Sequence, residues 1–193
     1  YSAPTEIAYA IKDAGFDRCS TASNHTFDKG AKGIKATLDE FDSLGLGQAG
    51  MARTPDEIEP KVFNVKGINV AHLSYTYGFN GISAPNDEAW RSARIEPTRI
   101  ITDAQKARDM GARVVIVSMH WGRETQTELS EFQLTNADAI TKSGLIDLVI
   151  GHHAHVVQKI DKVNDVWAIF GLSNLISYLP TTNAFSANTQ DGI

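Results

Sequence analysis

The stretch Leu145-Ile146-Asp147-Leu148-Val149-Ile150-Gly151-His152-His153-Ala154-His155 joins an apolar run to three histidines within four residues. The run from Leu145 to Ile150 is typical of a strand that is buried on both faces, as in a parallel sheet. The glycine and the histidines follow at the carboxyl end of that strand, where open α/β sheets collect ligand-binding groups. This stretch therefore predicts both an α/β fold and a site at one edge of its sheet.

A second strand upstream repeats this arrangement. Val114-Val115-Ile116-Val117 indicates a buried strand, and Met119-His120-Trp121-Gly122 follows it directly. A helix from about Pro97 to a stop at Gly111 precedes the strand. Helices and strands therefore alternate, as in α/β proteins.

The elements after these two strands fit the same fold. Ser130-Glu131-Phe132-Gln133 has the form of a capping box that opens a helix, and Gly144 suits its end. Val156–Val163 and Val166–Phe170 resemble a hairpin that turns at Asn164-Asp165. The tail from Ser173 to Ile193 is polar.

The N-terminal half alternates as well, although less regularly. We expect helices over Pro4–Ala14 and from Ile34 to Leu44, and strands over Phe16–Ala22, Val62–Val65 and Ile68–Tyr75. The polar segment Gly78–Trp90 is read either as a lid or as a plain connector.

Length and composition favour one domain over residues 1–193, since 193 residues with 42% hydrophobic content suffice for one core. The net charge is -5 and there is no run of Lys or Arg, which argues against nucleic acid or an anionic membrane as partner. The single cysteine, Cys19, excludes an internal disulfide framework.

Five of the six histidines fall in three loops that each follow an apolar strand. His153 and His155 can both face one cavity if their loop is irregular, and neutral imidazoles suit Zn, Mn, Fe or Ni. The alternative is a polar loop with incidental histidines. For His152 three roles stay open: it faces the site, supports a ligand from behind, or packs away.

The other candidates each carry a structural alternative. Asn24-His25-Thr26 is a turn, a glycosylation acceptor or part of the site, and Asp28 is a helix cap or a functional group. His120, at a strand end, is read as functional, and Trp121 as packing beneath it. His72 lies within a strand pattern and is read as a packed histidine.

In chain order, an Asn-His loop, a strand ending in His and a Gly-x-His-x-His loop resemble the second half of the calcineurin-like metallophosphoesterase superfamily. More narrowly, the chain resembles the bacterial capsule-synthesis CapA (PGA_cap) family over almost its whole length. The stretches that carry this resemblance are Asp13–Asp17, Ala22–Gly33, His120-Trp121-Gly122, Gly151–Val156 and Phe170-Gly171-Leu172-Ser173-Asn174.

The resemblance implies a metallophosphatase-like α/β/β/α sandwich with mixed sheets, and a divalent metal such as Mn, Zn, Fe or Mg. It implies that Asn24, His120 and His153 correspond to ligands of one metal and His155 to a ligand of a second. His25 corresponds to the general acid that protonates a leaving oxygen, which agrees with the chemistry of two-metal sites.

The chain departs from the family pattern in two places. The superfamily's Asp-x-His and Gly-Asp motifs lie upstream of its Asn-His loop, and neither occurs in the 23 residues before Asn24. We therefore expect an incomplete fragment that lacks its N-terminal strand, with doubtful metal occupancy because the bridging carboxylate is missing. The second departure is Ser173, where the family generally has Gly before Asn174, so the backbone there is less free.

These observations lead to one main functional hypothesis and two alternatives. The main one is a metal-dependent hydrolase or transferase of the bacterial cell surface, acting on an anionic polymer such as poly-gamma-glutamate or on a phosphoester, beside capsule-synthesis membrane proteins. The resemblance places it outside the cytoplasm, secreted or anchored through a segment absent from this chain. The alternatives are a non-catalytic polymer-binding subunit and a phosphoesterase for small substrates.

Overall fold

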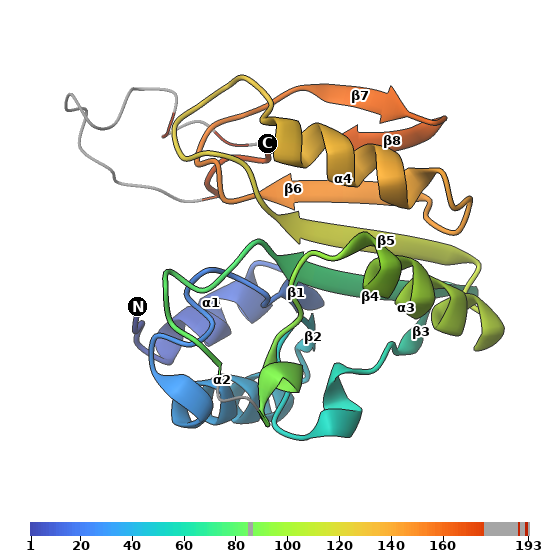
Figure 1. Cartoon of the computed structure of the whole chain (residues 1–193). Coiled ribbons are helices and arrows are strands. Elements are labelled where there is room, and N and C mark those ends of the chain that lie inside the picture. The colour runs from blue at the N-terminus through green and yellow to red at the C-terminus, as the bar shows by residue number, and fades with distance from the viewer. Residues whose placement is uncertain (85–86, 176–188, 190–191, 193) are drawn as a thin grey trace. The chain divides into compact units, whose positions relative to one another are not determined.

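The structure is a computed structural model that describes residues 1–84, 87–175, 189 and 192 (Figure 1). These residues form two compact units, one of residues 1–59 with 74–94 and the other of residues 60–73 with 95–193. Each unit is considered separately. That the chain is one domain stays a prediction.

The first unit contains a small parallel sheet and two main helices. Its elements are α1 (Glu6–Asp13), β1 (Arg18–Ser20), α2 (Gly30–Ser43), β2 (Gly47–Ala49) and the 3-10 helices η1 (Pro55–Ile58) and η2 (Ala89–Arg91). β1 pairs in parallel with β2. Ile34 and Leu38 of α2 are buried against Phe27 and Phe79. The sequence did not predict β2 or η1, because segments of three or four residues carry too little periodicity.

The larger sheet has six strands in the order β3-β4-β5-β6-β8-β7. They are β3 (Val62–Val65), β4 (Ile68–Thr76), β5 (Val114–His120), β6 (Leu148–His152), β7 (Ile160–Val163) and β8 (Val166–Ile169). β6 runs parallel to β5 and β8, whereas the β3–β4 and β7–β8 pairs are antiparallel. The expected mixed α/β architecture with two sheets is therefore confirmed.

Helices α3 (Pro97–Asp109) and α4 (Glu131–Thr141) lie side by side on one face of the larger sheet (Figure 1). The capping box predicted for α4 is present, since the Ser130 side chain accepts a hydrogen bond from the Gln133 amide and the Gln133 side chain returns one to Ser130. On the buried face of α3 lie Ile100, Ala104 and Ala107, which have the predicted helical spacing.

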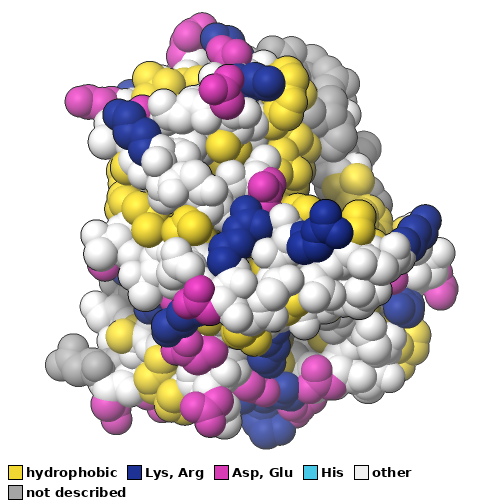
Figure 2. All heavy atoms as spheres, turned by 90° about the vertical axis from the view of Figure 1, so that its right-hand side faces the viewer, with side chains coloured by type: hydrophobic (Ala, Val, Ile, Leu, Met, Phe, Trp, Pro, Cys, Tyr) yellow, Lys and Arg dark blue, Asp and Glu magenta, His cyan; other side chains and the backbone are white. Residues whose placement is uncertain are grey.

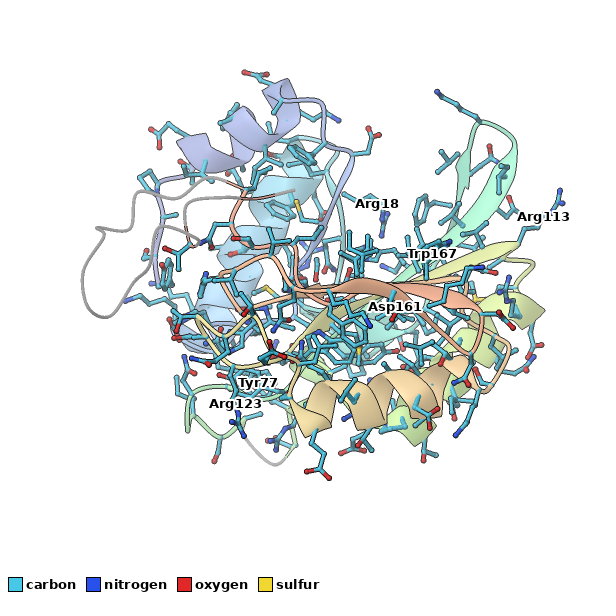
Figure 3. All side chains as sticks on the ribbon, turned by 90° about the horizontal axis from the view of Figure 1, so that it is seen from above. Arg18, Tyr77, Arg113, Arg123, Asp161 and Trp167 are labelled. Atoms are coloured by element: carbon cyan, nitrogen blue, oxygen red, sulfur yellow. The ribbon has the colours of Figure 1, made fainter. Side chains whose placement is uncertain are left out.

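The predicted hairpin is also present. Asn164 and Asp165 have φ of 50° and 66°, as a two-residue hairpin turn of the I′ type requires. Trp167 on β8, labelled in Figure 3 with Asp161 on β7, is 52% exposed and lies 5.4 Å from the Lys162 ammonium. This hairpin ends the sheet at the side of β7.

The surface agrees with the composition. On the face drawn in Figure 2, acidic side chains lie among the Lys and Arg side chains, and no extended basic patch is visible. No helix in the described part of the chain is both long and apolar enough to cross a membrane. Most of the polar tail from Ser173 onward lies outside the described residues, whereas Gly78–Trp90 forms neither strand nor α-helix where it is described.

Candidate metal centre

The histidines of the second unit lie at the carboxyl ends of two neighbouring parallel strands. His120 is the last residue of β5, His152 is the last residue of β6, and the two face each other in the register of the sheet. The β6 strand then passes directly into the loop that carries His153 and His155. The predicted site at this edge of the sheet therefore brings histidines from both loops together.

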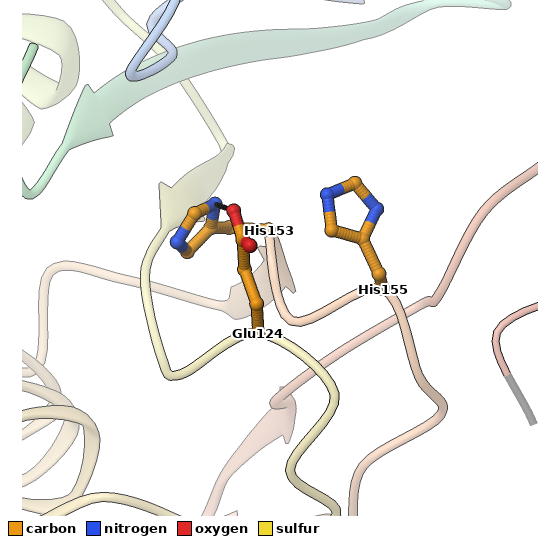
Figure 4. Close-up of side chains that lie close together, drawn as sticks. All are labelled: Glu124, His153 and His155. Atoms are coloured by element: carbon orange, nitrogen blue, oxygen red, sulfur yellow. Dashed lines mark ion pairs between the residues drawn. The ribbon is translucent and has the colours of Figure 1, made fainter. Parts of the chain in front are cut away.

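Glu124, His153 and His155 form a group that can hold a metal ion (Figure 4). One ligand atom from each side chain lies within 4.8 Å of the others, and His153 Nδ1 is 4.0 Å from Glu124 Oε1. The His153 side chain is 5% exposed, whereas the Glu124 side chain is 54% exposed. Two imidazoles and one carboxylate are a donor set of catalytic zinc sites, so these residues fit a divalent metal.

The backbone of this loop has an uncommon conformation. His153 and His155 have φ of 98° and 58°, a region that side chains other than glycine rarely adopt. Thr125, beside Glu124, also has a positive φ of 63°, and its amide donates to the Ala154 carbonyl at 2.7 Å. Strained backbone of this kind is concentrated at binding and catalytic sites. The hydrogen bond also ties the Glu124 loop to the histidine loop.

His155 is oriented by Asn174. The Asn174 Nδ2 donates to the Thr189 carbonyl at 2.7 Å, so the other amide atom, Oδ1, is an acceptor only. His155 Nδ1 lies 2.6 Å from that oxygen and must therefore carry a proton. In the neutral ring the lone pair is then on Nε2, which leaves this atom as the metal donor.

His120 adjoins the group through His153, whose ring centroid is 4.7 Å away. His120 Nδ1 also lies 2.6 Å from His152 Nδ1, so one of these nitrogens donates to the other. Burial, followed by the nearby His153 and His72, lowers the pKa of His152 to about 4. His152 is therefore neutral near pH 7 and supports His120 from behind, the second of its three predicted roles.

Beneath these loops lies Trp121, which is fully buried. Its ring stacks on Phe170 at a centroid distance of 5.8 Å, and its Nε1 donates to the Phe170 carbonyl at 3.0 Å. The predicted packing role of Trp121 is confirmed. The prediction for His72 is confirmed as well, because its Nε2 pairs with Ser118 Oγ at 2.8 Å inside the second unit.

The Asn-His loop belongs to the first unit. Asn24 is 3% exposed and its Nδ2 donates to Asn80 Oδ1 at 3.2 Å, so its burial argues against glycosylation. His25 Nδ1 donates to Asp28 Oδ2 at 2.8 Å, since a carboxylate only accepts.

Asp28 is not the helix cap that one alternative proposed for it. The N-cap of α2 is Lys29, and no side chain accepts a capping hydrogen bond there. The physical reason is that the Asp28 carboxylate is already engaged by His25. A functional role for Asp28 stays a prediction.

The structure therefore groups the predicted ligands unevenly. It brings His153 and His155 together and sets His120 beside them. Asn24 and His25 lie in the other unit, so their participation in the same site stays a prediction. Sequence reasoning missed Glu124. The available signal was a carboxylate four residues after His120, in the loop that follows a buried strand.

Solved structures share this fold. A putative 5'-nucleotidase from Staphylococcus aureus matches 86% of this chain and 34% of its own, with a TM-score of 0.59 and 17% identity. The NAD nucleotidase of Haemophilus influenzae matches 87% of this chain and 29% of its own, with a TM-score of 0.56 and 18% identity. The fold is therefore metallophosphatase-like, as the resemblance implied.

Relatives in sequence point to capsule synthesis. The capsule biosynthesis protein CapA of Bacillus anthracis is 32% identical over 179 residues, which are 91% of this chain and 43% of that protein. The PGA biosynthesis protein CapA of Bacillus subtilis is 28% identical over 180 residues, 89% of this chain and 45% of that protein. The chain thus spans less than half the length of these relatives.

A family model covers the chain more completely. The model of the bacterial capsule synthesis protein PGA_cap matches residues 1–179, which include all three histidine loops and Asn174. Because this match extends over far more than half of the sequence, the chain belongs to the bacterial capsule synthesis family PGA_cap.

Proposed function

We propose that this chain carries the metal-dependent hydrolase or transferase site of a capsule-synthesis protein. The observation that supports it is the group of Glu124, His153 and His155 at the carboxyl ends of parallel strands. The substrate we propose is an anionic polymer of the poly-gamma-glutamate type or a phosphoester. The family to which the chain belongs and its nucleotidase-like fold support these two substrate classes.

A divalent cation held at this group would supply Lewis acidity to polarise the attacked carbonyl or phosphoryl oxygen. The residues of the chain have the remaining tasks. Asn174 holds the His155 ring and His152 holds the His120 ring, which limits both imidazoles to one orientation. The neutral state of His152 avoids a buried positive charge beside a cation.

His25 is the proposed general acid. Its Nδ1–H is bound to the Asp28 carboxylate, so Nε2 is the atom that would pass a proton to a leaving oxygen. The carboxylate also fixes the orientation of the ring. The His25 side chain is 38% exposed, so a substrate can reach it.

The test replaces His153 and His155 by Ala in the full-length protein and follows metal content together with turnover of poly-gamma-glutamate and of an aryl phosphate. We expect both metal content and turnover to be lost. Unchanged turnover would contradict the proposal. The matched control is His72→Ala, which removes a histidine of the same unit that is bonded to Ser118.

The same turnover measurements, together with EDTA treatment, separate the alternatives. A polymer-binding subunit would retain its polymer after EDTA treatment and show no turnover, whereas hydrolysis of the aryl phosphate alone would favour a small-substrate phosphoesterase. The location we propose is the extracytoplasmic side of the cell, beside capsule-synthesis membrane proteins. Membership of the capsule synthesis family supports this location.

A further inference from the structure

We infer that the second unit holds a metal ion at His153 and His155, with the Glu124 carboxylate as a third ligand. These three residues all belong to the second unit. The inference deepens the proposed function and rests on it in one respect, because both require a bound metal ion. It also supplies a carboxylate to a set of imidazoles that otherwise has none.

The three donors lie close enough for coordination. With metal bonds of about 2.0–2.2 Å, tetrahedral ligand atoms are roughly 3.4 Å apart. His153 Nδ1 and Glu124 Oε1 are 4.0 Å apart, so they have to approach by less than an ångström. The His153 side chain is 5% exposed and the Glu124 side chain is 54% exposed, so we expect Glu124 to make the larger movement.

The His155 ring already has the tautomer that metal binding through Nε2 requires. Asn174 keeps the proton of His155 on Nδ1, so Nε2 faces no tautomer change when a metal arrives. Asn174 is therefore a positioning residue rather than a ligand. Outer partners of this kind typically raise metal affinity about 10–100-fold.

The loops that carry the ligands are joined to one another. The Thr125 amide donates to Ala154, and the Gln158 side chain donates to the Gln126 carbonyl at 2.9 Å. All of these residues belong to the second unit. These bonds hold two histidines and one glutamate, the donor set of some catalytic zinc sites, within one unit.

Zinc titration of the whole chain by calorimetry at neutral pH tests the ligand set. Glu124→Gln keeps the shape of the side chain but removes its charge. We expect it to weaken zinc binding by at least about 10–100-fold, which is the usual effect of removing a residue that positions a metal ligand. The matched control is Glu128→Gln, another exposed carboxylate of the same loop. Glu128→Gln should bind zinc as the unaltered chain does.

Nitrogen-15 NMR of the metal-free chain tests the role of Asn174 without any activity measurement. The His155 ring should be protonated on Nδ1 in the unaltered chain and in Asn174→Asp, which retains an acceptor oxygen. In Asn174→Leu this preference should be lost, and zinc affinity should fall about 10–100-fold. Circular dichroism spectra would establish that each variant is folded.

Two results would overturn the inference: no zinc binding by the unaltered chain, or an unchanged affinity in Glu124→Gln. Zinc binding without turnover would contradict the proposed function and leave this site intact. If turnover and zinc affinity are both unchanged in Glu124→Gln, this inference is contradicted and the proposed function stays intact.

Discussion

The Asn24-His25 loop and the His153-Ala154-His155 loop differ in how their polar side chains are satisfied. In the first loop each side chain has a protein partner of its own, Asn80 for Asn24 and Asp28 for His25. In the second loop His155 is bonded to Asn174, the His153 ring centroid lies 4.7 Å from that of His120 and 6.2 Å from that of His155, and the backbone is left-handed at both histidines.

This difference suggests different tasks for the two loops. A hydrogen-bonded His-Asp pair is suited to hold and release a proton. Crowded imidazoles beside one carboxylate gain most from a cation that all of them share, and such a cation can offset backbone strain. We therefore expect proton transfer to depend on the first loop and metal affinity on the second.

The largest expected effect separates these two tasks. His25→Ala should lower turnover by about 10²–10⁴-fold, the usual contribution of a general acid, while zinc affinity stays unchanged. The measurement is turnover in the full-length protein, together with zinc titration of the same variant. A parallel loss of zinc affinity would show that the two loops do not divide the work in this way.

The second prediction concerns the support of the histidine loop. Trp121→Ala should lower the free energy of unfolding by about 3–5 kcal/mol, because it removes a fully buried ring. It also removes the hydrogen bond to the Phe170 carbonyl. Urea unfolding measures this change.

Trp167→Ala is the control for that measurement, because Trp167 is half exposed in the same unit. Its cost should stay below about 1 kcal/mol. Equal losses for the two tryptophans would mean that the packing beneath the site contributes little.

The third prediction concerns Gly151, which passes close to two neighbours at the end of β6. A methyl group there would lie 1.9 Å from the Phe170 carbonyl oxygen and 2.5 Å from Trp121 Nε1. Gly151→Ala should therefore cost about 1–3 kcal/mol of unfolding free energy and weaken zinc binding by displacing the next residues.

Gly78→Ala is the matched control, because its added methyl would meet only the Arg94 guanidinium at 3.8 Å. A Gly151→Ala variant as stable as this control would contradict the close packing of β6 against Phe170.

Much of this architecture was predictable from the sequence. Long apolar runs such as Val114–Val117 and the capping box at Ser130 act over a few neighbouring residues, so sequence pattern is sufficient to identify them. The hairpin turn at Asn164-Asp165 was predictable for the same reason.

The features that the sequence did not predict depend on contacts between distant segments. Glu124 joins His153 only because the β5 and β6 loops meet at one edge of the sheet. Asn174 forms hydrogen bonds with His155 and Thr189, which lie 19 and 15 residues away along the chain. These two bonds determine the tautomer of His155. Asp28 was assigned either to a cap or to the site, and only the folded chain excludes the cap, because Lys29 occupies the N-cap position of α2.

The smallest expected effect concerns Ser173, the residue before Asn174 that departs from the family's usual glycine. Its φ is 65°, a conformation that costs a residue with a side chain about 1–2 kcal/mol. Its Oγ is buried and has no hydrogen-bond partner among the described residues. Ser173→Gly relieves both costs, but it adds about 0.5–1 kcal/mol of chain entropy to the unfolded state.

We therefore expect Ser173→Gly to raise the free energy of unfolding by roughly 0.5–1 kcal/mol, the difference between these terms, in urea unfolding experiments. Because Asn174 keeps its bonds to His155 and Thr189, zinc affinity should not change. Ser173→Ala is the control, since it removes the hydroxyl but retains the Cβ and its backbone strain. If Ser173→Ala is as stabilising as Ser173→Gly, the unpaired hydroxyl rather than the left-handed backbone is the source of the cost at this position.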